Sequence, residues 1–177
     1  MGKRAMDPNE TIKLIRQRIL NQQVVVIVGA GVSMQATAGA LAASWKGLIR
    51  SGIEWCRAKK PSCDADWRDR KLRQLESPKR TEFMGLANEI AEEIGGDGGS
   101  TGELAEWLQS TVGALKAERS EILEALHALG CLLVTTNYDG LMDKDGLPPV
   151  TWRARTRVHQ VIRGDATGII HLHGRWT

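Results

Sequence analysis

The chain has 177 residues, a length that suits one domain, and its 42% hydrophobic content is enough to form a core. Its 24 basic and 21 acidic residues nearly balance, and a net charge of +3 without a dense basic block argues against nucleic-acid binding. The N-terminus has no secretory signal, and no apolar run approaches the roughly 20 residues of a membrane span. Three cysteines without a CxxC pair exclude a disulfide framework, so we expect a cytoplasmic protein.

Residues 1–22 are predicted to form an N-terminal helix. Asp7 can cap this helix, Pro8 fits its first position, and Asn21 ends it. Three apolar side chains fall on one helical face: Ile12, Ile15 and Ile19.

Residues 23–177 are predicted to form an α/β domain. Residues 23–28 are a β-branched run without alternation, which is typical of a strand buried on both faces in a parallel sheet. Further short strands are predicted at 131–134, 150–153 and 168–172. Strands separated by helical segments favour an α/β layer fold.

A helical insert is predicted within this domain, over about residues 44–130. It opens with a helix that Ser44 can cap, followed by apolar residues at helical spacing, namely Trp45, Leu48, Ile49, Ile53 and Cys56. The stretch 59–80 is charged and contains two prolines, so it is predicted to be irregular. Helices are predicted at 81–94 and 120–129.

The segment GAGVS, residues 29–33, follows the first predicted strand. Gly29 would allow a tight turn, Gly31 would let the backbone approach a pyrophosphate, and Ser33 would add a hydroxyl donor. The dinucleotide fingerprint GxGxxG is incomplete, because Met34 stands where the third glycine belongs. Alone, the segment is equally compatible with a strand–helix turn that binds no ligand.

Two more polar segments follow later strands. In TTNYD, Asn137 and Asp139 would meet a ligand at the carboxyl end of a strand, although an Asx turn explains them as well. In HLHG, His171 and His173 would share a face if the strand continued through them. A metal pair there lacks a third ligand, and an isolated histidine is more often structural than catalytic.

In this order, GAGVS, TTNYD and HLHG resemble the signature of the sirtuins, whose motifs read GAG(I/V)S, TQN(I/V)D and HG. TTNYD and the LHG ending are more similar to a divergent bacterial sirtuin-like group. The resemblance implies a Rossmann-like parallel sheet with flanking helices, and NAD as the bound substrate. The predicted NAD-binding residues are Gly29, Ala30, Gly31, Ser33, Thr136 and Asp139. The predicted catalytic residues are Asn137, which would hold a ribose hydroxyl or a water, and His173.

Two departures from the sirtuin pattern bear on the reaction. The zinc module with two CxxC pairs is missing, and QATAGALAAS stands where sirtuin deacylases carry GIPDFR. We therefore expect no zinc, and an NAD hydrolase that releases nicotinamide and ADP-ribose, as in the NAD hydrolases of bacterial antiviral defence. The alternatives are an NAD-dependent protein deacylase, and a non-catalytic domain that binds NAD or ADP-ribose or forms oligomers.

The predicted sheet is smaller than that of a complete dinucleotide-binding fold. Such a fold has about six strands, and the sequence ends three residues after Gly174. The last strands are therefore expected to be missing from this stretch of chain. We expect either further domains beyond residue 177 or a homo-oligomer partner to complete the site.

Overall fold

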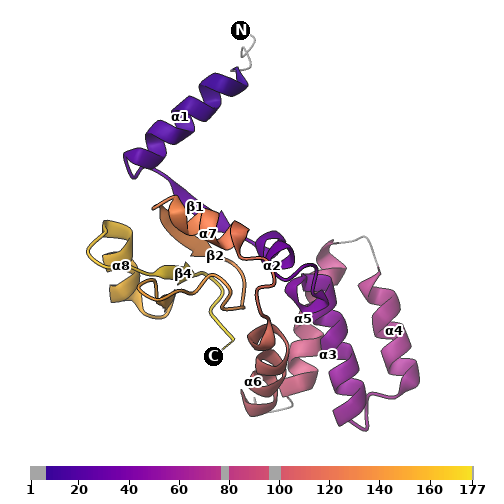
Figure 1. Ribbon diagram of the computed structural model, residues 1–177. Helices are drawn as coiled ribbons and strands as arrows, with labels where there is room; N and C mark the ends of the chain where they lie inside the picture. The colour runs from indigo at the N-terminus through magenta and orange to yellow at the C-terminus, as the bar shows by residue number, and fades with distance from the viewer. Residues whose placement is uncertain (1–6, 77–79, 96–100, 177) are drawn as a thin grey trace.

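The computed structural model describes residues 7–76, 80–95 and 101–176. Its sheet has four strands, all parallel, in the order β1-β2-β4-β3 (Figure 1). The strands are β1 (Val25–Val28), β2 (Leu132–Thr135), β3 (Pro149–Thr151) and β4 (Ile169–His171). The α/β class and the parallel sheet are thereby confirmed. Because the strands are parallel, their carboxyl ends all meet at one edge of the sheet.

Eight α-helices accompany the sheet within the described residues. They are α1 (Pro8–Leu20), α2 (Ala30–Ala36), α3 (Trp45–Lys59), α4 (Ala65–Leu75), α5 (Arg80–Gly95), α6 (Thr101–Ser110), α7 (Glu121–Ala128) and α8 (Arg155–Arg163). The helices predicted after Ser44 and at 81–94 and 120–129 are confirmed. Over the described ranges, none of these helices combines the length and apolar character that a membrane span requires.

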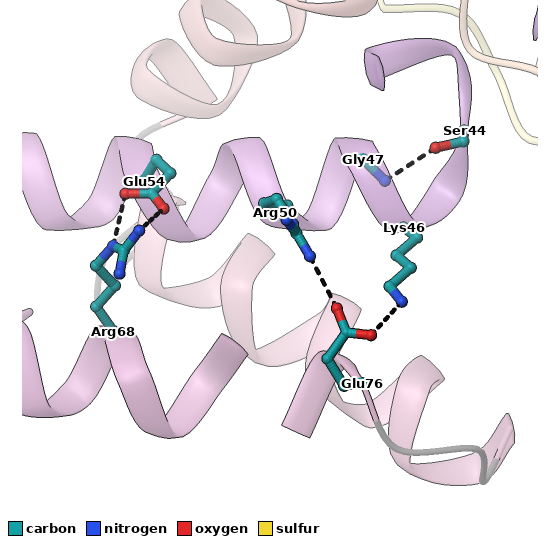
Figure 2. Close-up of polar contacts among 7 residues, drawn as sticks. All are labelled: Ser44, Lys46, Gly47, Arg50, Glu54, Arg68 and Glu76. Carbon is teal, nitrogen blue, oxygen red and sulfur yellow. Dashed lines mark hydrogen bonds and ion pairs between the residues drawn. The ribbon is translucent and has the colours of Figure 1, made fainter. Parts of the chain in front are cut away.

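Helices α3 to α6 pack around a core of their own, and we call this group the helical unit. Ser44 caps α3 as predicted, because its hydroxyl accepts from the Gly47 N–H at 3.0 Å (Figure 2). The most deeply buried side chains of the unit are Ile53, Cys56, Cys63, Leu86, Ile90 and Ile94. The apolar spacing seen in the sequence therefore predicts the buried face of α3, apart from Trp45, which is 44% exposed.

Ion pairs join α3 to α4 on the outside of the helical unit (Figure 2). Glu76, the C-terminal cap residue of α4, pairs with Lys46 and Arg50. Glu54 holds the Arg68 guanidinium through two contacts of 2.5 and 2.8 Å. Exposed pairs of this kind contribute little to stability, so the apolar core holds the unit together.

Helices α2 and α7 cover one face of the sheet, and α8 covers the other face only in part. On the first face the buried strand residues are Val28, Leu133 and Ile169. On the second face they are Val134, Val150 and Ile170, packed with side chains of α8. Helix α7 lies within the predicted insert of about 44–130, but it packs against α2 and the sheet and not in the helical unit.

Strand β1 lies at the edge of the sheet, and the prediction that it is buried on both faces is wrong. Val28 is buried, but Val25 and Ile27 are 54% and 67% exposed. Helix α8 packs beside β3, the strand at the opposite edge, and its cover does not reach β1. A β-branched run is therefore compatible with one open face here.

Two further helices differ from the sequence-based expectation. Residues 59–80 were expected to be irregular, yet α4 lies within them because Asp64 caps it, accepting from the Trp67 N–H at 2.8 Å. Helix α8 was not predicted; it ends at Gly164, whose φ of 78° suits a helix stop. Asp7 and Asn21 bound helix α1 as predicted, and residues 1–6 of the predicted range lie outside the described residues. Helix α1 buries none of its residues and projects from the rest of the chain (Figure 1).

Candidate functional site

The three motifs of the sequence meet at the carboxyl edge of the sheet. GAGVS follows β1 and forms the start of α2, TTNYD begins with the last residue of β2, and HLHG begins with the last residue of β4. Strands β1 and β2 are neighbours, as are β2 and β4. Segments that lie more than a hundred residues apart in the sequence are therefore side by side, at the edge where α/β sheets bind ligands.

A buried chain of hydrogen bonds connects GAGVS to TTNYD. The Asn137 Nδ2 donates to Ser33 Oγ at 2.8 Å, and Ser33 Oγ donates to Asp139 Oδ2 at 2.7 Å. The other Asp139 oxygen accepts from the Leu141 N–H at 3.1 Å. All three side chains are at most 8% exposed. Asp139 thus supports the loop, and the predicted catalytic Asn137 has a fixed orientation.

Threonines at the end of β2 attach the same loop to β1. The Thr136 N–H donates to the Val28 carbonyl at 3.0 Å, and the Thr136 hydroxyl lies 3.3 Å from the same oxygen. The hydroxyl of Thr135 accepts from the Asn137 N–H at 3.0 Å. Both the backbone and the side chain of Asn137 are therefore held by hydrogen bonds.

A cleft of about 620 Å³ opens between the helical unit and this edge of the sheet. Its lining residues are Trp45, Phe83, Met84, Ala87, Asn88, Thr136, Tyr138 and His173. A narrow crevice of about 20 Å³ adjoins it. The two share Trp45, Thr136 and Tyr138, and the crevice is also lined by Ala30, Asn137 and Asp139. The cleft volume falls within the range of roughly 300–1,000 Å³ that is typical of ligand sites.

Aromatic rings form one side of the cleft. Trp45 meets Tyr138 edge to face, with ring centroids 6.0 Å apart, and Tyr138 lies 6.4 Å from the His173 ring at a tilt of 33°. Such surfaces suit planar rings and cations. Tyr138 connects the two units, because it also packs against the core of the helical unit.

The two histidines of HLHG do not share a face, because β4 ends at His171. The His171 side chain is fully buried, whereas His173 is exposed in the following turn and lines the cleft. The His171 ring lies 3.0 Å from Asp143. Of the two, only His173 is placed to meet a ligand.

The GAGVS residues differ in part from their predicted roles. Gly29 has extended backbone with φ of −124°, which any residue adopts, so a tight turn does not require glycine there. Gly31 is exposed and faces a separate depression beside Met34 and Arg119. The Ser33 hydroxyl is committed to Asp139 and does not face the cleft. Of these residues, Ala30 is the one that lines the crevice.

Sequence reasoning missed several residues of this region. Trp45 was assigned to the core by its spacing, but as the first residue of α3 it lies at the helix end and borders the cleft. Tyr138 stands within a recognised motif and has an aromatic role there. Asp143 and Arg175, which contact each other, lie outside all three motifs.

Within the described ranges no group of three or more His, Cys, Asp or Glu side chains is arranged to hold a metal ion. Comparison of the chain with protein-family models, with curated proteins and with solved structures finds no match in any of the three.

Proposed function

We propose that this chain cleaves the nicotinamide–ribose bond of NAD by hydrolysis. The observation that carries the proposal is that Asn137 and His173, from two distant motifs, line a crevice and a cleft that share three lining residues at the carboxyl edge of a parallel sheet. The motif order that resembles the sirtuins supplies the identity of the substrate. By the same resemblance, we propose a role in NAD depletion during antiviral defence, carried out by a homo-oligomer or a longer chain.

The chemistry needs few protein groups. In NAD the nicotinamide ring is a pyridinium cation bound to the ribose, so it departs as a neutral molecule. The ribose then passes through an oxocarbenium-like state. The enzyme must therefore orient the ribose and present a nucleophile. His173 can take a proton from a water or a ribose hydroxyl as a general base. Asn137 can hold that water or hydroxyl in line with the anomeric carbon.

The aromatic residues around the cleft suit the nicotinamide ring of NAD. Nicotinamide in NAD is a cationic aromatic ring, and Trp45 and Tyr138 offer aromatic faces and edges to it. Hydrolysis is favoured over deacylation because the segments typical of sirtuin deacylases are absent from the sequence.

The test is to incubate the chain with NAD and to quantify nicotinamide and ADP-ribose chromatographically. His173→Ala and Asn137→Ala are each expected to lower the rate by about 10²–10⁴-fold, the usual contribution of a positioned acid–base group. His159→Ala, an exposed histidine on α8, is the matched control and should keep the wild-type rate. Turnover that survives both site substitutions would contradict the residue assignment.

The alternatives give different outcomes in the same assay. A deacylase would release nicotinamide only after an acylated peptide is added. A non-catalytic binder would show an NAD-dependent rise in melting temperature while the NAD is recovered intact. Either result would replace hydrolysis as the function.

A further inference from the structure

Asp143 lies between TTNYD and HLHG in the sequence. It contacts one residue that precedes His173 in the chain and one that follows it. Its Oδ1 accepts from His171 Nε2 at 3.0 Å, and its Oδ2 lies 2.8 Å from Arg175 Nε. Since a carboxylate can only accept, Nε2 carries the hydrogen of the His171 ring. The contact with Arg175 is an ion pair whose alignment does not meet hydrogen-bond geometry. One carboxylate therefore holds the residues two before and two after His173.

His173 itself stands in a tight turn between these two anchors. The Gly174 N–H donates to the His171 carbonyl at 3.3 Å, and Gly174 has a φ of 91°, a conformation that favours glycine. His171 is fully buried, and the Arg175 side chain is 24% exposed. The imidazole of His173 thus stands in a turn that also exposes Leu172, between the buried His171 and the partly buried Arg175.

Backbone hydrogen bonds attach the turn to TTNYD, but they do not determine the direction of the His173 ring. The Leu172 N–H donates to the Thr135 carbonyl at 2.9 Å, and the Trp176 N–H donates to the Tyr138 carbonyl at 3.1 Å. These bonds place the strand end and the chain after the turn. Asp143 adds side-chain contacts to the residues two before and two after His173.

Gly140 packs closely against the ion pair of Asp143 and Arg175. A Cβ added at Gly140 would lie 2.8 Å from Arg175 Nη2 and 2.9 Å from Asp143 Oδ2, so glycine is what lets the ion pair sit against this backbone. The second ring nitrogen of His171, Nδ1, is buried without a partner. Burying charges in this way stabilises a fold weakly at best, so stability alone does not explain the cluster.

We propose that Asp143 is a positioning residue that acts through His171 and Arg175 to hold the His173 imidazole against Tyr138 in the cleft. The catalytic part of this inference rests on the proposed function. Asp143 is not one of the residues that line the cleft or the crevice. It therefore acts on the reaction only through the residues it holds.

The first test is independent of activity and uses nuclear magnetic resonance of the whole chain. Tyr138 is the only tyrosine of the sequence, so its ring signals are unambiguous, and His173 signals are assigned by their loss in His173→Ala. We expect a nuclear Overhauser contact between the two rings in the wild type. Asp143→Asn should abolish this contact, whereas Asp145→Asn, at an exposed aspartate two residues on, should keep it. An unchanged contact in Asp143→Asn would overturn the proposal.

The second test measures NAD cleavage. Asp143→Asn should lower kcat by about 10- to 100-fold while KM stays within about twofold, because misplacing a reacting group by about 1 Å costs this much without loss of binding. In a His173→Ala background the same substitution should lower the rate no further. A further loss there, or a rise in KM alone, contradicts positioning through His173.

The two tests separate this inference from the proposed function. If the wild type cleaves no NAD, the hydrolase proposal fails, and the ring contact still decides whether Asp143 positions His173. If Asp143→Asn does not fold, Arg175→Gln breaks the cluster from its other end and is judged by the same ring contact.

Discussion

The helical unit and the sheet bury different chemistry. The buried side chains of the helical unit are apolar or thiols, and its charges lie outside in ion pairs. Among the residues that the structure describes, the buried polar side chains lie along the sheet and α2, namely Ser33, Thr37, Thr135, Asn137, Asp139 and His171. Buried polar groups cost free energy unless they are paired. Their concentration along the sheet and α2 therefore coincides with the region of the proposed NAD site.

The cysteines of the helical unit follow the same division. Burial raises the pKa of the Cys56 thiol to about 12 and also raises the pKa of Cys63. A thiol of this kind stays neutral and packs as a small apolar group. Although these residues could carry chemistry, the helical unit uses them as core.

The largest expected loss of stability follows from a substitution in the core of the helical unit. Ile53 is fully buried in the helical unit, and Ile53→Ala should lower the free energy of unfolding by about 2–5 kcal/mol through the cavity it leaves. Urea denaturation measures this change. Ile12→Ala, at a residue of α1 that is 49% exposed, is the matched control and should change it little. If both variants lose the same free energy of unfolding, Ile12 must be buried in solution by another surface that packs on α1.

A smaller loss of stability is expected at the sheet edge, accompanied by a loss of function. Ser33→Ala removes the hydroxyl between Asn137 and Asp139, leaves both side chains with an unpaired polar atom, and should cost about 1–3 kcal/mol. NAD cleavage should fall in protein that is still folded, because Asn137 loses its restraint. Ser110→Ala, at an exposed serine of α6, should change neither property. Full activity in Ser33→Ala would show that the buried chain is not needed for the reaction.

The smallest effect is expected at the surface of the helical unit. The hydrogen bond from Lys46, and then its charge and that of Arg50, lower the pKa of the Glu76 carboxyl in the folded chain. A lowered folded-state pKa stabilises the fold above the unfolded pKa, and this contribution is lost as the pH falls through the folded value. Glu76→Gln should therefore lower the melting temperature slightly at pH 7 and not at all in strong acid. A difference that persists in acid or in high salt would contradict an electrostatic origin.

Regular patterns in the sequence predicted much of the fold. Local patterns predicted several elements that the structure contains: the caps Asp7 and Ser44, the strand β1 and the apolar face of α3. These local patterns do not predict which faces of the strands and helices other elements will bury. Ile27 is exposed because α8 lies at the far edge of the sheet, a fact of tertiary arrangement that no local pattern contains.

The candidate site was predicted as motifs and only partly as roles. Polar residues after parallel strands must gather at one edge, so the meeting of Asn137 with GAGVS follows from topology. The role of Ser33 depends on its side-chain direction, and the role of Trp45 depends on its place at a helix end beside a cleft. Asp143 belongs to no motif, because its importance comes from contacts with His171 and Arg175 across the fold.

The buried chain between GAGVS and TTNYD has a polarity that Asp139 determines. A carboxylate has no hydrogen to give, so the single hydroxyl hydrogen of Ser33 must point to Asp139. The Ser33 oxygen can then only accept, and Asn137 must turn its amino end toward it. The carbonyl end of the Asn137 carboxamide is left outside the chain, as an acceptor for hydroxyl or water hydrogens. The Asp139 carboxylate thereby decides which half of the Asn137 amide is available to a ligand.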